Sequence, residues 1–323
     1  FQSRLENWLT RRTDGFCRRA LAALVGRYAE YRRRSGPRIL AQVPTLVIGS
    51  LMAGGAGKTP IVRLLALRCR QYGRCAVVCR GWKGHLKKAT LVERHMTAHQ
   101  IGDEARWFRH VLPPEVDVVA SPDLSEGQHL ASCIADIILV DDGFQSTSLP
   151  RTADIVVGDP GLSSGVFPNG CLRENPAALK YADLNWGHGT KGIHELATQS
   201  GTAFSVLSHY ELTEIVTTDG VYLPADWLKN RKVVIASGLA RNDSFLRTIR
   251  KAGADIQHVV ECGDHRPIAR RFLSKLNDFP VIITEKDAAK WQHDMPAVVA
   301  CVSVIITRGE AELAKLLEQW CTV

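Results

Sequence analysis

Long apolar runs are missing from this chain of 323 residues. No stretch reaches the about 18 uninterrupted apolar residues that a membrane-spanning helix requires, so we expect no transmembrane segment. No secretory signal peptide is recognisable at its start. The chain also lacks a C-x-x-C pair, and its nine cysteines are scattered at positions 17, 69, 75, 79, 133, 171, 262, 301 and 321. This scatter favours buried, reduced thiols in a cytosolic protein over a zinc site.

Net charge is nearly absent outside one segment. The whole chain carries +8, and residues 1–40, with ten arginines and three acids, carry +7 of it. Because the excess is an N-terminal patch and not a property of the whole chain, we expect no nucleic-acid partner. A composition of 45% hydrophobic and 23% charged residues is typical of a folded globular chain, here long enough for two domains.

The basic segment is also amphipathic. Apolar residues from Phe16 to Tyr28 recur at helical spacing, while Arg18, Arg19 and Arg27 fall on the other side. Two interpretations stay open at this point. The helix packs on the globular body with its arginines in solvent, or its apolar face enters a membrane surface while the arginines meet anionic head groups.

Beyond residue 43, short strands rich in valine and isoleucine alternate with helical stretches. This alternation predicts a mainly parallel sheet covered on both faces. The larger unit has expected strands at TLVIGS, CAVVCRG, VDVVAS and ADIILVDDG, with a helix at PIVRLLALRCRQYG. The smaller unit has expected strands at KVVIASG, IQHVVECGD, PVIITEKD and AVVACVSVII.

These patterns divide the chain into four segments. An extended stretch is expected to turn at Asp219-Gly220, a favourable turn pair, and to form a β-ribbon. The predicted segments are the basic amphipathic segment at 1–40, a larger α/β domain at 41–202, the ribbon at 203–225 and a smaller α/β domain at 226–323.

The stretch MAGGAGKTP follows the first predicted strand directly. A glycine-rich loop between a strand and a helix points backbone N–H groups at a phosphate, and the helix dipole adds to the attraction. Lys58, expected as an exposed loop residue, would reach the β- and γ-phosphates, and the Thr59 hydroxyl would bind Mg²⁺. The strict motif has glycine at the position of Met52, so the alternative is that GKT occurs by chance in an ordinary turn. The flanking strand and helix favour a phosphate loop made of Met52, Ala53, Gly54, Gly55, Ala56, Gly57, Lys58 and Thr59.

Three further polar stretches stand at element ends. In ADIILVDDGFQ, Asp141 and Asp142 end a strand where a nucleotide-binding sheet places its magnesium carboxylate, although aspartates also form ordinary turns. In IGDEARW, the acids Asp103 and Glu104 suit a helix N-terminus equally well. In CGDHRP, a lone histidine, His265, is more often structural than catalytic.

Seven motifs follow one another over residues 50–290: GGAGKTP, CRGWKG, IGDEA, ADIILVDDGFQ, CLREN, GDHRP and TEKDAAK. This series resembles the tetraacyldisaccharide 4′-kinases of lipid A biosynthesis, whose motifs run GGxGKTP, SRGYG, VGDEP, DDGxQH, LRE, PDHH and TEKDAVK. The chain departs from them at Trp82 for tyrosine, Ser146 for histidine, Arg266 for the second histidine of PDHH, and in the stretch ADLNWGHG. These departures bear on substrate detail more than on chemistry.

The resemblance implies a P-loop NTPase-like domain with a second, smaller α/β domain. It also implies an ATP- and Mg²⁺-dependent kinase that phosphorylates the 4′-hydroxyl of a tetraacylated glucosamine disaccharide 1-phosphate. The expected partners are this lipid A precursor and an anionic membrane surface, at the cytoplasmic face of the bacterial inner membrane, with no obligate protein partner. A P-loop ATPase or GTPase switch, or a kinase of a soluble acceptor, is the alternative.

The resemblance also assigns roles to individual residues. Asp103 is the implied base, supported by His265, and Lys58 holds the phosphates. The implied Mg²⁺ ligands are Thr59 with Asp141 or Glu104, and the implied substrate contacts are Arg173, Asp142 and Arg80. A P-loop switch would need the loop and the metal, but neither the Asp103–His265 pair nor the basic N-terminus.

Overall fold

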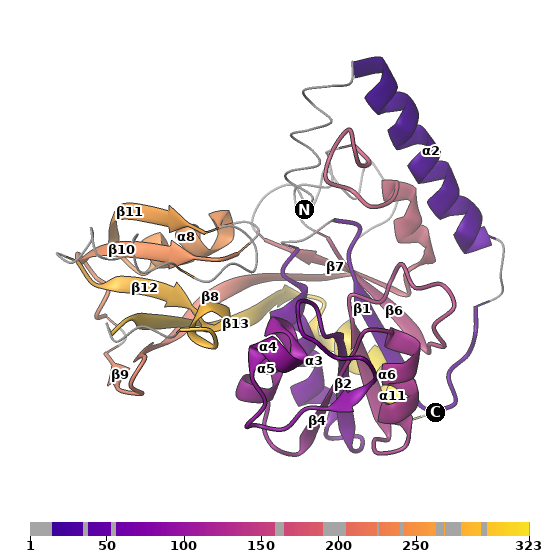
Figure 1. The fold of residues 1–323 in the computed structure, drawn as a ribbon, viewed down its shortest axis with the longest axis horizontal. Coiled ribbons are helices and arrows are strands. Elements are labelled where there is room, and N and C mark those ends of the chain that lie inside the picture. The colour runs from indigo at the N-terminus through magenta and orange to yellow at the C-terminus, as the bar shows by residue number, and fades with distance from the viewer. Residues whose placement is uncertain are drawn as a thin grey trace. The chain divides into compact units, whose positions relative to one another are not determined.

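The computed structural model describes a mainly parallel α/β protein (Figure 1). Its chain divides into two compact units: Phe1–Lys58, Asp136–Ser208 and Ile306–Val323 in unit 1, and Thr59–Ala135 and His209–Ile305 in unit 2. The four-segment division drawn from the sequence stays a prediction. The described residues are 15–34, 38–52, 56–158, 165–189, 205–224, 226–239, 242–262, 268, 279–291 and 296–322.

Unit 1 is built around strand β1 (Thr45–Gly49). This strand runs parallel to β5 (Ile137–Asp141) on one side and to β6 (Ala153–Gly158) on the other, and β7 (Leu184–His188) follows β6 (Figure 1). All residues of these four strands are buried. Burial on both faces explains why β1 and β5 are apolar runs without alternation in the sequence. β6 is missing from the strands that the sequence predicted.

The other elements of unit 1 come from three parts of the sequence: near the start of the chain, after β6 and at the end of the chain. The first residues of β8 (Val206–Thr217) pair in parallel with β7. The helices are α2 (Gly15–Arg34), the 3₁₀ helix η2 (Pro176–Tyr181) and α11 (Glu310–Cys321). α2 confirms the helix predicted for the basic segment. No helix in the described part of the chain is both long and apolar enough to cross a membrane.

Unit 2 begins with a strand–helix series. β2 (Cys75–Arg80) pairs in parallel with β4 (Val116–Ser121), and β3 (Thr90–Leu91) pairs antiparallel with β4. Its helices are α3 (Lys58–Cys69), α4 (Ala98–Ile101), α5 (Asp103–Val111) and α6 (Leu124–Ser132). The predicted helix after the phosphate loop therefore starts at Lys58 and ends before the expected Gly73.

The rest of unit 2 is a parallel strand group. β10 (Lys232–Ser237) lies between β11 (Asp255–Glu261) and β12 (Val281–Thr284), and β12 pairs with β13 (Val298–Arg308) (Figure 1). Its helices are α8 (Asp243–Lys251) and α10 (Glu285–Ala288). β8 pairs antiparallel with β9 (Tyr222–Leu223), which confirms the turn predicted at Asp219-Gly220. Of the free cysteines, Cys17 and Cys133 are exposed, against the expectation of buried thiols.

Gly49, the last residue of β1, has no room for a side chain. A Cβ built there would lie 2.2 Å from the Cβ of Phe144 and 3.0 Å from its backbone nitrogen. Phe144 is fully buried in the apolar cluster beside the phosphate loop, so it has little freedom to move. Gly26 of α2 differs, because a Cβ there would meet its nearest atom at 4.0 Å.

We therefore predict that Gly49→Ala destabilises the protein by about 1–3 kcal/mol through overpacking. Gly26→Ala, the matched control in an open helical position, should stabilise it by about 0.5–1 kcal/mol. Urea unfolding followed by circular dichroism measures both. Equal midpoints for Gly49→Ala and the wild type would show that β1 and Phe144 are not packed as described.

Candidate functional site

A lysine and an aspartate meet where α3 starts and β5 ends. The Nζ of Lys58, the first residue of α3, lies 3.1 Å from Oδ1 of Asp142, the residue after β5. Asp142 has a left-handed backbone with φ 58°, a conformation that aspartate tolerates better than most residues. The Lys58 side chain is only 10% exposed, so the expectation of an exposed loop lysine is wrong.

Arg173 binds the same carboxylate from another segment. Its Nη1 and Nη2 each donate to one oxygen of Asp142 at 3.0 Å, the two-pronged geometry that suits a guanidinium. Burial by itself would raise the pKa of Asp142. The charges of Lys58 and Arg173 outweigh that effect and hold the pKa well below its ordinary value. Asp142 is therefore ionised at neutral pH and compensated by two cations.

Backbone contacts fix Arg173 beside the start of the phosphate loop. Leu172 forms a β-bridge with Met52, and the Arg173 N–H donates to the carbonyl oxygen of Leu51 at 2.7 Å. Leu51, Met52 and Leu172 are all buried in one apolar cluster. Met52 stands where the strict motif has glycine, and the structure gives it a packing role. The predicted substrate residue Arg173 is thus brought to Lys58 and Asp142.

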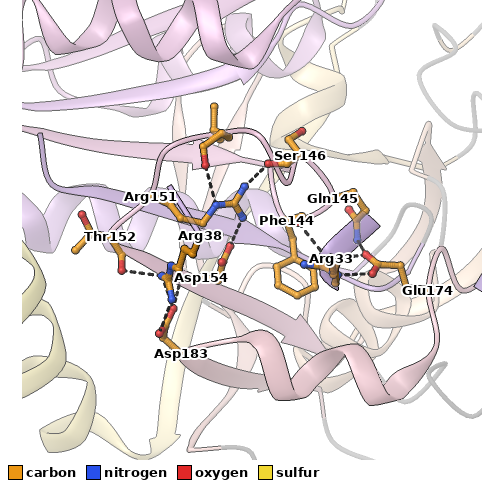
Figure 2. A network of polar contacts seen from close by, with 11 residues as sticks. Arg33, Arg38, Phe144, Gln145, Ser146, Arg151, Thr152, Asp154, Glu174 and Asp183 are labelled. Carbon is orange, nitrogen blue, oxygen red and sulfur yellow. Dashed lines mark hydrogen bonds and ion pairs between the residues drawn. The ribbon is translucent and has the colours of Figure 1, made fainter. Parts of the chain in front are cut away.

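A second layer of contacts reaches α2. Arg33 of α2 donates from Nε and Nη2 to the two oxygens of Glu174 at 2.6 and 2.7 Å, and its guanidinium lies 3.8 Å from the centre of the Phe144 ring (Figure 2). Gln145 donates from Nε2 to Glu174 at 2.8 Å and accepts from Arg173 at 3.1 Å. Gln145 therefore joins the α2 ion pair to the Asp142 cluster.

Sequence reasoning missed Arg33, Gln145 and Glu174 as members of the site. Gln145 and Glu174 belong to quoted motifs, DDGFQ and LREN, where a role in orienting the neighbouring Asp142 and Arg173 could have been suspected. Arg33 gave no such signal among the ten arginines of its segment. The side chains of Arg33 and Glu174 are only 7% and 5% exposed, which a solvated basic patch would not predict.

Other predicted loop and metal residues are buried around this cluster. Asp141, the last residue of β5, and Thr59, the second residue of α3, are both buried. Ala56 is also buried, and Gly57 has the positive φ of 76° that glycine adopts without strain. Ala53, Gly54 and Gly55 lie outside the described residues, as does the predicted catalytic His265.

The remaining predicted residues belong to unit 2. Asp103 and Glu104 start α5, as the sequence suggested, and each meets a lysine. Nζ of Lys290 lies 2.7 Å from Oδ2 of Asp103, and Nζ of Lys286 lies 3.2 Å from Oε1 of Glu104. Neither lysine was predicted as a site residue. Arg80 ends β2, and its Nη1 donates to the carbonyl oxygen of Pro122 at 3.4 Å.

The fold and the Lys58–Asp142 arrangement together define a P-loop phosphotransferase. The family model for tetraacyldisaccharide-1-P 4′-kinase matches residues 19–322. This chain belongs to that family and has its function, as a kinase of lipid A biosynthesis. The motif order in the sequence predicted this, and the prediction is confirmed.

Individual relatives agree with the family match. A tetraacyldisaccharide 4′-kinase from Jannaschia sp. (strain CCS1) is 34% identical over 298 residues, 88% of this chain and 88% of that protein. One from Allorhizobium ampelinum is 32% identical over 285 residues, 84% and 79% of the two chains. The crystal structure of LpxK from Aquifex aeolicus, 25% identical, has a TM-score of 0.75 and covers 98% of this chain and 99% of its own.

We predict that Lys58→Ala abolishes turnover, because the charge expected to meet the phosphates is lost. Since Lys58 is nearly buried against Asp142, the free energy of unfolding should also fall, by about 1–3 kcal/mol. The protein should still fold, because Arg173 remains as a partner of Asp142. Steady-state kinetics and thermal melting measure the two effects. Lys315→Ala, at an exposed position of α11, is the matched control. A kcat near the wild-type value for Lys58→Ala would exclude this cluster as the phosphate site.

Proposed function

We propose that this kinase transfers the γ-phosphoryl group of ATP, with Mg²⁺, to the 4′-hydroxyl of a tetraacylated glucosamine disaccharide 1-phosphate. The observation that carries the proposal is the cluster of Lys58, Asp142 and Arg173 at the end of β5. A lysine at a helix start behind a glycine-rich loop suits the β- and γ-phosphates. The Aquifex aeolicus structure, described as a complex with ATP, supports ATP as the donor.

The oxygen groups around the loop fit Mg²⁺. In nucleotide sites this cation takes one or two carboxylates, with phosphate oxygens and waters as its other ligands. The buried carboxylate of Asp141 and the hydroxyl of Thr59 are such donors, and Glu104 is a third candidate. We assign Mg²⁺ to Thr59 with Asp141 or Glu104. When bound, Mg²⁺ neutralises charge on the phosphate oxygens.

The acceptor hydroxyl is a poor nucleophile and needs a base within hydrogen-bond reach. We assign that role to Asp103, supported by His265, and we assign Arg173 to the 1-phosphate of the acceptor with Asp142 and Arg80 as further contacts. Asp142 orients the guanidinium of Arg173 through two hydrogen bonds.

The test is the product formed from ATP and a detergent-dispersed tetraacylated disaccharide 1-phosphate. Mass spectrometry should find the acceptor heavier by one phosphoryl group, and ATP consumption should depend on the acceptor. Asp103→Ala should lower kcat by roughly two to four orders of magnitude, while the KM for ATP changes little. ATP hydrolysis that proceeds equally without acceptor, with no phosphorylated lipid, would contradict the proposal and indicate a switch ATPase.

We also propose that α2 docks on an anionic membrane surface. Leu21, Leu24, Tyr28 and Tyr31 follow one face of the helix at spacings of three and four residues, and they are 43%, 62%, 64% and 67% exposed. A helix that simply packed on the protein body would bury such a stripe. An exposed apolar stripe on an arginine-rich helix is typical of interfacial helices, which favours the second of the two interpretations. Arg33 and Glu174 hold the C-terminal end of this helix.

Replacing Arg18, Arg19 and Arg27 by glutamine should weaken binding to anionic vesicles and flatten its salt dependence. Each arginine near such a surface contributes about 1 kcal/mol, an attraction that salt screens. Replacing Leu21, Leu24 and Tyr28 by serine should instead remove the part of the vesicle binding that persists at high salt. Vesicle co-sedimentation at low and high salt separates the two effects, and activity on a short-chain acceptor should survive. Binding equal to wild type for both variants would leave α2 as an ordinary packed helix.

A further inference from the structure

The TEKDAAK motif at residues 284–290 contains none of the groups assigned above to the nucleotide, the metal or the acceptor. Its first part fixes the backbone where β12 passes into α10. Thr284 caps α10 and donates from Oγ1 to Oδ2 of Asp287 at 2.7 Å. Asp287 is buried and accepts the N–H of Gly238 at 3.1 Å. These bonds hold the segment in one conformation.

Glu285 connects the same segment to α3 and β13. Its Oε1 lies 3.4 Å from Nη1 of Arg63 on α3, the helix that begins with Lys58. Its other oxygen, Oε2, accepts the N–H of Val302 at 3.3 Å. Thr284, Glu285 and Asp287 thus serve to position α10. These contacts leave the two lysines of the motif, Lys286 and Lys290, without a structural explanation so far.

Both lysines are directed to the acids at the start of α5. Lys286 lies in α10, and Lys290 lies two residues beyond the end of this helix. They pair with the adjacent carboxylates of Glu104 and Asp103. The Lys290–Asp103 pair is the shorter, at 2.7 Å, and the better shielded, with both side chains 13% exposed. At this shielding the attraction between the charges is stronger than in water.

The backbone just before Asp103 is also constrained. Gly102, which precedes it, has φ 89°, and a Cβ there would lie 2.8 Å from the carbonyl oxygen of Trp82. A Cβ on Gly84 would lie 2.6 Å from the nitrogen of Gly102. The glycines of CRGWKG and IGDEA therefore let the two loops touch. The start of α5 is fixed by this contact, and the side chain of Asp103 is fixed by Lys290.

We propose that Lys290 is a positioning residue that holds the Asp103 carboxylate in the orientation required to accept the acceptor proton. The inference rests on the proposed role of Asp103 as the base. In the phosphoryl transfer, the proton of the acceptor hydroxyl passes to Asp103 while the hydroxyl oxygen bonds to the γ-phosphorus. The bond between the γ-phosphorus and the β,γ-bridging oxygen breaks, which releases ADP. A carboxylate has about four acceptor sites, so a lysine partner and the hydroxyl can share it.

The test is a double-mutant cycle on kcat. Lys290→Met retains most of the methylene stem but removes the charge. It should lower kcat by roughly 10- to 100-fold, the usual effect of losing a support of a functional side chain. The KM for ATP should stay within about threefold of the wild type. Lys290→Arg should recover part of kcat. In the Asp103→Ala background, Lys290→Met should lower kcat no further, because the group it positions is absent.

Each alternative outcome is distinguishable. A normal kcat for Lys290→Met beside a severe loss for Asp103→Ala would overturn the inference and leave Asp103 as the base. Losses that multiply in the double variant would also overturn it, since Lys290 would then act independently of Asp103. A normal kcat for Asp103→Ala, with lipid still phosphorylated, would overturn the inference together with the base assignment but not the kinase activity. Thermal melting of every variant, with Lys251→Met at an exposed position of α8 as the control, separates these effects from unfolding.

Discussion

One partly buried carboxylate, Asp142, organises the polar cluster of unit 1. Burial alone would raise the pKa of this carboxyl, and the charges of Lys58 and Arg173 lower the pKa below its ordinary value. Each cation is in turn placed by the fold: Lys58 by the start of α3, and Arg173 by the bridge between Leu172 and Met52. Asp142 thereby holds Lys58, the residue that we propose for the phosphates, with Arg173 beside it.

The same cluster continues outward to α2. Arg173 contacts Gln145, Gln145 contacts Glu174, and Glu174 pairs with Arg33, as Figure 2 shows for the outer members. Buried ion pairs contribute modestly to net stability, because desolvation opposes the attraction, but losing one partner is costly. We infer that this chain of contacts serves mainly to fix geometry. It connects α2, the helix with the exposed apolar stripe, to Asp142 and its partner Lys58.

Much of this arrangement was predictable from the sequence, for physical reasons. β1, β2, β4 and β5 are mostly apolar, and the glycine-rich loop and the strand-end aspartates are short local motifs. The partners of the site residues were not predictable in this way. Arg33 and Glu174 are 141 residues apart, and Lys286 and Glu104 are 182 apart, so no local pattern marks them. The near-burial of Lys58 also depends on such tertiary contacts, which is why the exposed-loop expectation failed.

We propose that Asp142 positions Lys58 for the phosphates and retains Arg173. The most direct measurement is a crystal structure of the protein with Mg²⁺ and a non-hydrolysable ATP analogue. We expect Nζ of Lys58 within about 3 Å of β- and γ-phosphate oxygens, with its contact to Asp142 lengthened, and Arg173 still bound to Asp142. Phosphates bound away from Lys58, with the lysine still on Asp142, would contradict it.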